Sequence, residues 1–176
     1  MYKIGEFVVY GSEGVCEVEN IKKLNISEFN KNKTYYILKP MHENGKVFVP
    51  VDTNVFIRAV LKYEEIEKLI EGIPAIEKNE CDMKGVKVLQ DYYKKLLKHY
   101  ECIDLLTELV SLNEKKNDLI KNKKKLNQID DRFMKIAKGL LEDEFSIALG
   151  IPKEDVESYI IDKLNKNTES TIFDKE

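Results

Sequence analysis

Short runs of β-branched and aromatic residues, each followed by turn-forming residues, characterise the first sixty positions of the chain. They predict five strands, which we place at residues 7–10, 15–21, 34–39, 46–49 and 56–59. Ile4, Phe7 and Val9 are expected to face inward. Pro50 has no N–H group, so we expect it to end its strand or to lie on an edge. By closing into a small barrel, such a meander would bury its alternating apolar residues and lose most of its exposed edges.

The spacing of apolar residues changes near Leu61–Tyr63, from every second position to every third or fourth. Such a change usually marks the passage from a sheet to a helical domain. The second pattern predicts helices at residues 64–71, 84–98, 101–118, 128–149 and 153–164. We expect Gly150 to cap the fourth of these helices and Pro152 to lie in the first turn of the last. The sequence thus predicts an α+β protein with a β domain at 1–62, a compact all-α domain at 63–165 and a frayed polar tail at 166–176.

Composition and charge narrow the classes of function. The 176 residues are 43% apolar and 35% charged, which is ordinary for a folded globular protein. We expect a cytoplasmic protein with no membrane segment, because we find neither a signal peptide nor an apolar run of about 20 residues. The net charge of −3 divides into +2 over residues 1–62, 0 over 63–126 and −5 over 127–176. Because there are only two arginines, contact with a nucleic acid would depend on lysine and would be weakly specific and sensitive to salt.

The chain lacks the residue patterns of a catalytic, metal or cofactor site. The two histidines and the three widely spaced cysteines form no evident nucleophile–base pair and have no zinc-ligand spacing. Glu142, Asp143 and Glu144 are neighbours in a predicted helix, so their side chains point in different directions, and we interpret them as part of a solvated helix face. We therefore expect no enzyme activity, no cofactor, no metal and no small-molecule substrate.

Lysines gather in two places in the second half of the chain. The predicted helix at 84–98 interleaves lysines with Tyr92 and Tyr93, a pattern that suits contact with the DNA backbone. A tyrosine-rimmed helix that packs on its neighbours would have the same pattern, and both interpretations stay open. Residues 121–125 read Lys-Asn-Lys-Lys-Lys, shortly after two more lysines. This run is either a solvated loop between helices or a contact for phosphates.

Several short motifs occur in a characteristic order along almost the whole chain. The N-terminal ones are Ile4-Gly5-Glu6, Val8-Val9-Tyr10, Gly14, Tyr35-Tyr36-Ile37-Leu38 and Val47-Phe48-Val49-Pro50. The helical half contributes Leu126 to Asp131, Ala137, Leu140, Glu144 and Val156-Glu157-Ser158-Tyr159-Ile160. In their order and spacing these motifs resemble the CarD/CdnL family of bacterial transcription regulators. The resemblance implies an N-terminal five-stranded Tudor-like or SH3-like β-barrel followed by a compact all-α helical domain.

The resemblance also implies partners. In that family the barrel docks on the β subunit of RNA polymerase through an exposed strand. The helical domain contacts promoter DNA and helps to hold the melted bubble open. Our candidate for the docking strand is 46–49, because an exposed Phe48 is otherwise costly. The implied polymerase-binding residues are Leu24, Lys46, Phe48, Pro50 and Arg58.

The chain departs from the family at one functional position in the helical half. Family members carry a tryptophan that wedges into the minor groove, whereas this chain has no Trp and reads Gly85-Val86-Lys87-Val88-Leu89 at the corresponding stretch. We therefore expect weak, sequence-tolerant DNA contact through lysines, with one tyrosine as a stacking ring. The residues expected to carry it are Lys84, Lys87, Tyr92, Tyr93, Lys94, Lys95 and Lys98. The alternative is a protein-interaction adaptor that keeps the Tudor-like module and does not bind DNA.

Overall fold

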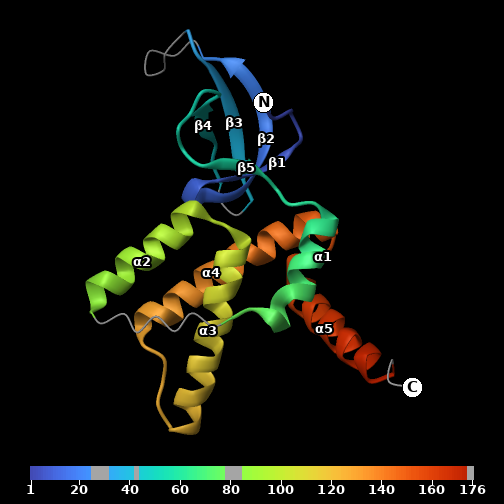
Figure 1. The fold of residues 1–176 in the computed structure, drawn as a ribbon. Helices are drawn as coiled ribbons and strands as arrows, with labels where there is room; N and C mark the ends of the chain where they lie inside the picture. The colour runs from blue at the N-terminus through green and yellow to red at the C-terminus, as the bar shows by residue number, and fades with distance from the viewer. Residues whose placement is uncertain (25–31, 42–43, 78–84, 174–176) are drawn as a thin grey trace. The chain divides into compact units, whose positions relative to one another are not determined.

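Alternating β-branched residues form a five-stranded sheet at the N-terminal end of the chain (Figure 1). The computed structural model describes residues 1–24, 32–41, 44–77 and 85–173. The strands are β1 (Phe7–Tyr10), β2 (Gly14–Lys23), β3 (Thr34–Pro40), β4 (Val47–Pro50) and β5 (Ile57–Ala59). All five predicted strands are confirmed, with small shifts at their ends. Their backbone contacts define one compact unit, Met1–Val60, and the rest of the chain forms a second, Leu61–Glu176.

The sheet is antiparallel throughout, in the order β4-β3-β2-β1-β5. β4 and β5 therefore lie at the two ends of the hydrogen-bonded ladder. A register shift between Val18 and Asn20 interrupts the pairing of β2 with β3, as a β-bulge does. Pro50 ends β4, and β4 is an end strand, as its missing N–H group predicted.

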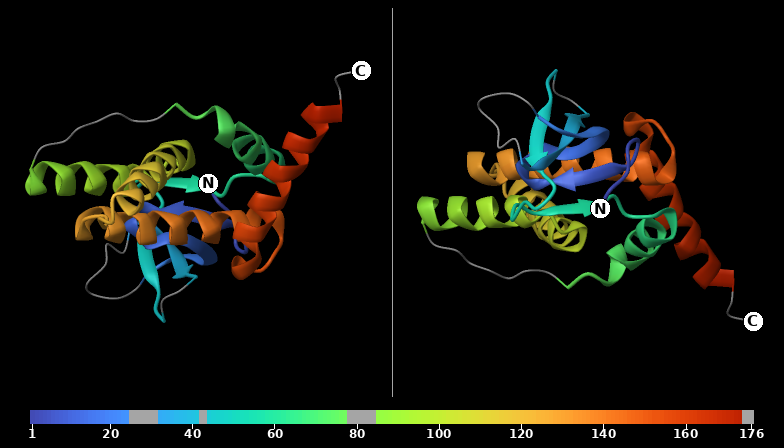
Figure 2. Two further views of the ribbon diagram at one scale, coloured as in Figure 1. Left: turned by 90° about the horizontal axis from the view of Figure 1, so that it is seen from below. Right: turned by 90° about the horizontal axis from the view of Figure 1, so that it is seen from above.

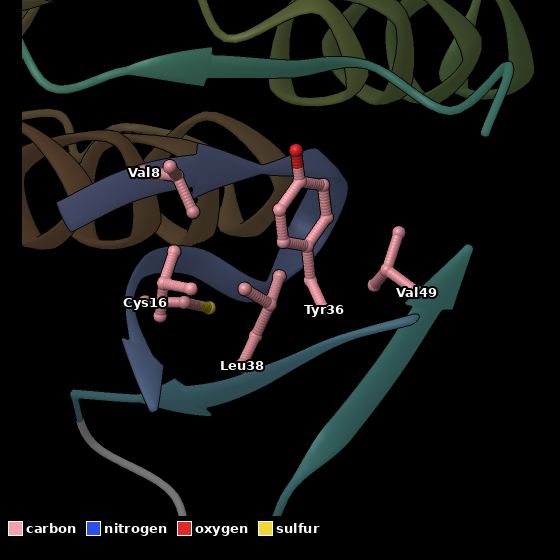
Figure 3. Close-up of a cluster of buried hydrophobic side chains, with 6 residues drawn as sticks. Val8, Cys16, Tyr36, Leu38 and Val49 are labelled. Atoms are coloured by element: carbon pink, nitrogen blue, oxygen red, sulfur yellow. The ribbon is translucent and has the colours of Figure 1, made fainter. Parts of the chain in front are cut away.

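One face of the sheet carries the hydrophobic core of the first unit. Its buried members come from four strands (Figure 3). They are Val8, Cys16, Val18, Tyr36, Leu38 and Val49. The predicted inward face was partly wrong: Ile4 is 62% exposed, and Val8 rather than Val9 belongs to this cluster. Val8 and Val9 are both fully buried, so β1 is covered on both faces and its alternation could not show which residue faces this core.

The second unit is built from five helices. They are α1 (Tyr63–Gly72), α2 (Val86–His99), α3 (Cys102–Lys121), α4 (Gln128–Leu149) and α5 (Val156–Phe173). Each corresponds to a predicted helix, although α5 runs well past the predicted end at residue 164. Gly150 caps α4 in the left-handed conformation, as expected. Pro152 instead precedes a short 3-10 turn, Lys153–Asp155, which leads into α5.

Helix α4 supplies much of the core of the second unit. Phe133, Ala137, Leu141 and Phe145 recur every fourth residue along it and are buried. On another side of the unit, α1 packs against α5, and Glu67 accepts hydrogen bonds from Tyr159 (2.6 Å) and from Lys163. Across the described ranges, no helix combines the length and apolar character that crossing a bilayer requires.

The prediction of a solvated acidic face on α4 is wrong for two of its three residues. Glu144 is fully buried and Asp143 is 6% exposed. Glu144 accepts hydrogen bonds from the Leu61 amide (2.9 Å) and from the Cys102 thiol (3.1 Å), and Asp143 pairs with Lys153 (2.5 Å). These partners lie far away in sequence or beyond the end of the helix, so the local pattern of charges could not reveal them.

Candidate functional sites

Among the described residues no strand pairs with the outer edge of β4, which we call the open edge. Val51 donates its N–H to the carbonyl of Thr34 on β3 (2.9 Å), and the register pairs Val49 with Tyr36. Hydrogen-bonded and non-bonded pairs alternate along an antiparallel ladder, so the N–H and C=O groups of Phe48 point away from β3. The carbonyl of Pro50 points the same way, and its ring offers no donor. The outer edge of β4 is therefore the candidate place for one added strand, with Phe48 at its centre.

The side chain of Phe48 extends a second apolar cluster on the sheet. Phe48 lies directly across from Ile37, so the two share the face opposite the core shown in Figure 3. Ile37 clusters there with Tyr35 and Leu24, all 5% exposed, whereas Phe48 is 37% exposed. Phe48 is therefore the accessible rim of this cluster. Leu24 is buried, which makes it a support for that face rather than a contact residue.

Of the other two predicted docking residues, Lys46 directly precedes β4 and forms an ion pair, and Arg58 lies on the other end strand. The Lys46 ammonium pairs with Glu19 (2.5 Å), and both side chains are substantially exposed, so this ion pair contributes little stability. Arg58 belongs to β5, where it lies across from Val9, at the opposite end of the ladder from β4. The structure thus brings Leu24, Phe48 and Pro50 together on one side of the sheet and places Arg58 on the other end strand.

Helix α2 carries the predicted DNA-contact residues in the second unit. Its inward face includes Tyr93, which is 5% exposed. The ring of Tyr93 stacks on Phe133 of α4, with centroids 4.1 Å apart, and its hydroxyl donates to Asp130 (2.8 Å). Burial, together with this carboxylate, raises the pKa of Tyr93 well above its usual value of 10.0. Tyr93 therefore cannot serve as a stacking ring for a base, and this part of the prediction is wrong.

Tyr92 keeps part of its ring accessible. Its hydroxyl donates to Glu108 of α3 (2.9 Å), a carboxylate that is 8% exposed. The bond fixes the ring orientation against α3 and leaves Tyr92 as the tyrosine of this helix that a ligand can reach. The two adjacent tyrosines thus differ in role because they are one residue apart on a helix, about 100° around its axis.

The lysines of α2 form an exposed stripe. Lys87, Lys94 and Lys98 follow one another at spacings of seven and four, so they lie along one side of the helix, and Lys95 lies on the neighbouring side. All four are exposed, and none has an ion-pair partner among the residues that the structure describes. Asp91 is an exposed carboxylate on the same side and lowers the positive potential there. Lys84, the remaining predicted contact, lies outside the described residues.

Two exposed valines flank Lys87 at the start of α2. Val86 is 66% exposed and Val88 54% exposed. Val88 lies outside the apolar stripe of α2, which runs through Leu89, Tyr93 and Leu96, and this departure was a signal in the sequence. Val86 continues the stripe by its spacing, so only the structure shows that it is exposed. Small apolar side chains beside a lysine match the chemistry of proteins that press apolar groups between base steps.

The fold and these surfaces define an α+β interaction protein with two units. One unit offers an open strand edge with an accessible phenylalanine, and the other offers a helix with a stripe of exposed lysines. Residues 2–61 match the family model of the CarD-like/TRCF RID domain, where RID denotes the RNA polymerase-interacting domain. The chain therefore carries an N-terminal RNA polymerase-interacting domain of the CarD-like/TRCF kind. This match covers the sheet unit, and the helical unit lies outside it. No curated protein sequence matches the chain.

Proposed function

We propose that this protein is a non-enzymatic bacterial transcription regulator that docks on the β subunit of RNA polymerase and acts on promoter open complexes in the cytoplasm. The observation that carries the proposal is the open edge of β4, which lies within the matched polymerase-interacting domain. The strand order also suits a Tudor-like barrel that stays open between β4 and β5, so that another strand can pair with the edge of β4.

The docking step is an added strand. A partner strand that pairs with β4 gains backbone hydrogen bonds at Phe48, and the Phe48 ring gives that pairing an apolar contact. Pro50 supplies an acceptor but no donor, so it limits the paired stretch at that end. Backbone pairing of this kind uses N–H and C=O groups, so it does not require charged side chains along β4.

Three substitutions at one position test this step. Phe48→Ala removes the ring and keeps the outward N–H, whereas Phe48→Pro removes both, and the pairing of β4 with β3 does not use that N–H. Retention by RNA polymerase core in a pull-down should fall for Phe48→Ala, fall further for Phe48→Pro and be abolished for Phe48→Glu. Val55→Glu is the matched control, since Val55 is 47% exposed and lies outside β4. Equal retention of the Ala and Pro variants would refute strand addition, and a photocrosslinker at residue 48 that labels another subunit would refute the assignment to β.

For the helical unit we propose contact with promoter DNA through the lysines of α2. Phosphate contacts by lysine release counterions, so affinity should fall steeply with salt, with a log–log slope of roughly −0.9 for each phosphate neutralised. Val88 lies one helical turn before Tyr92 on the same side of α2, so this small apolar side chain and the accessible ring would meet the groove together. Contact of this kind is weak and tolerant of sequence, because none of these side chains reads base edges in a bidentate manner.

The DNA step is tested with a fork-junction duplex, with and without polymerase. The triple variant Lys87→Gln, Lys94→Gln, Lys98→Gln should flatten the salt dependence, with the slope smaller in magnitude by up to about 2.7. A charge-matched control replaces three exposed lysines of the sheet unit, Lys22, Lys23 and Lys39, and should leave the slope unchanged. If the wild-type protein binds no DNA in either condition, the helical unit serves a protein-interaction adaptor instead.

A further inference from the structure

The connection between α3 and α4 holds a basic loop in a defined conformation. At the end of α3, Lys123 donates its N–H to the Ile120 carbonyl (2.9 Å) and Lys124 donates to the Leu119 carbonyl (2.8 Å). These two bonds are those of a Schellman motif, which closes the last turn of a helix. At the other end, the Asn127 side chain accepts from the amides of Ile129 (3.0 Å) and Asp130 (2.9 Å) and so caps α4. The loop is therefore ordered at both ends.

Lys123 occupies the position in this motif that glycine usually takes. Its φ of +55° lies in the left-handed region, where a side chain is disfavoured. The corresponding position after α4 is Gly150, with a φ of +66°. A residue that keeps a side chain in spite of this strain is a candidate for a functional role, and here the side chain is a lysine.

The lysines around this turn divide into two groups. Lys115 pairs with Asp130 (2.7 Å) and Lys121 pairs with Asp118 (3.0 Å). The second group consists of exposed lysines for which the described part of the chain supplies no ion-pair partner. They are Lys116, Lys123, Lys124 and Lys125. Lys116 lies within α3, about two helical turns before Lys123. The other three ammonium groups are concentrated on one short turn and available to an anionic ligand.

This basic loop leads into the end of α4 that packs against the inward face of α2. The buried carboxylate of Asp130, in the first turn of α4, accepts hydrogen bonds from Tyr93 of α2 (2.8 Å) and Lys115 of α3 (2.7 Å). The loop leads directly into that first turn. In all the views of Figures 1 and 2, the N-terminal ends of α2 and α4 lie on the same side of the helical unit. One extended ligand on that side of the helical unit can therefore reach both the basic loop and the lysines of α2.

We propose that the basic loop, residues 121–125, is a second phosphate-binding element that contacts the backbone of the same duplex as α2. This inference rests on the proposed DNA contact of the helical unit. The loop contains lysine and asparagine only, and it lacks the aromatic, arginine and apolar side chains that form the energetic centre of protein interfaces. Lysine ammoniums on an ordered turn suit phosphate oxygens, which supply charge without sequence information.

The test measures binding of the full chain to a fluorescent duplex of mixed sequence across a range of salt concentrations. The loop variant Lys123→Gln, Lys124→Gln, Lys125→Gln should reduce the magnitude of the log–log salt slope by up to about 2.7. Its effect should add to that of the α2 triple variant, because both lysine groups contact one duplex. The control triple at Lys22, Lys23 and Lys39 should again leave the slope unchanged.

The outcomes separate this inference from the proposed function. If the α2 variant flattens the slope and the loop variant does not, the loop proposal is overturned and DNA contact by α2 stands. If the wild-type protein shows no salt-dependent binding, both fall. If the loop variant keeps the wild-type slope but loses retention by polymerase in the absence of DNA, the loop binds protein and the inference is wrong.

A single substitution guards against a loss of folding. Lys123→Gly places glycine where the backbone favours it, so the turn should be preserved and the urea midpoint should not fall. The salt slope should nevertheless shrink by roughly 0.9, because one ammonium group is gone. A Lys123→Gly protein with an unchanged slope, together with an unchanged slope for Lys124→Gln and Lys125→Gln, would overturn the proposal.

Discussion

Replacing Asp130 with alanine should destabilise the helical unit more than the loss of a typical acidic residue in the first turn of a helix. The Asp130 side chain is completely buried. It accepts hydrogen bonds from the Tyr93 hydroxyl (2.8 Å), the Lys115 ammonium (2.7 Å) and the Asn127 amide (2.8 Å). It thereby ties α2, α3 and the start of α4 to one carboxylate.

The magnitude follows from which partners can turn to water after the substitution. The Lys115 side chain is 52% exposed, so its ammonium group can be solvated, whereas Tyr93 is 5% exposed and its hydroxyl would lose its acceptor inside the unit. Breaking a buried charged pair costs about 3–5 kcal/mol. Because Lys115 is partly exposed, we expect Asp130→Ala to lie at the lower end of this range, at about 3 kcal/mol. Tyr93→Phe removes one hydrogen bond to a charged acceptor and should cost about 1.5 kcal/mol.

Urea denaturation followed by far-ultraviolet circular dichroism measures these free energies of unfolding, because the helices dominate that signal. The double variant Tyr93→Phe, Asp130→Ala has no orphaned hydroxyl, so its cost should be smaller than the sum of the two single costs by about 1–2 kcal/mol. Additive costs, or a cost below about 1 kcal/mol for Asp130→Ala, would show that the carboxylate does not hold the three helices together.

Two further predictions concern the helical unit. Burial of Glu67 alone would raise its pKa, but hydrogen bonds from Lys163 and Tyr159 outweigh the burial and hold the pKa below the usual 4.5. The ionised carboxylate therefore stabilises the fold fully above pH 4.5, and this stabilisation is lost as the pH falls through the lowered pKa. Glu67→Gln should therefore cost about 1.5–3 kcal/mol in urea titrations at neutral pH, and a gap from wild type that persists at acid pH would contradict the assignment. Gly150→Ala should cost about 1 kcal/mol in the same assay. The cost comes from backbone strain alone, because the added Cβ meets no atom within 4 Å. An unchanged urea midpoint would argue against a left-handed cap.

Local signals in the sequence were sufficient to predict the elements of this protein. Strand and helix positions follow from the period of apolar residues, and the ends of β4 and α4 follow from a missing N–H at Pro50 and from the conformational freedom of Gly150. The domain family of the N-terminal unit was also recognisable, because its motifs occupy consecutive strands whose order the backbone pairing preserves.

The tertiary structure decided which polar and aromatic side chains are accessible. Tyr92 and Tyr93 are adjacent and chemically alike, yet only packing against Phe133 and Asp130 shows that Tyr93 is buried. The sequence around Glu144 is typical of a surface carboxylate, whereas the structure shows that Glu144 accepts a hydrogen bond from the distant Leu61 amide. Contacts of this kind join residues far apart in the chain, so they depend on how the elements pack together. The periodicity of a single segment carries no information about that packing, which is why the sequence determined the elements and only the fold determined which side chains a partner can reach.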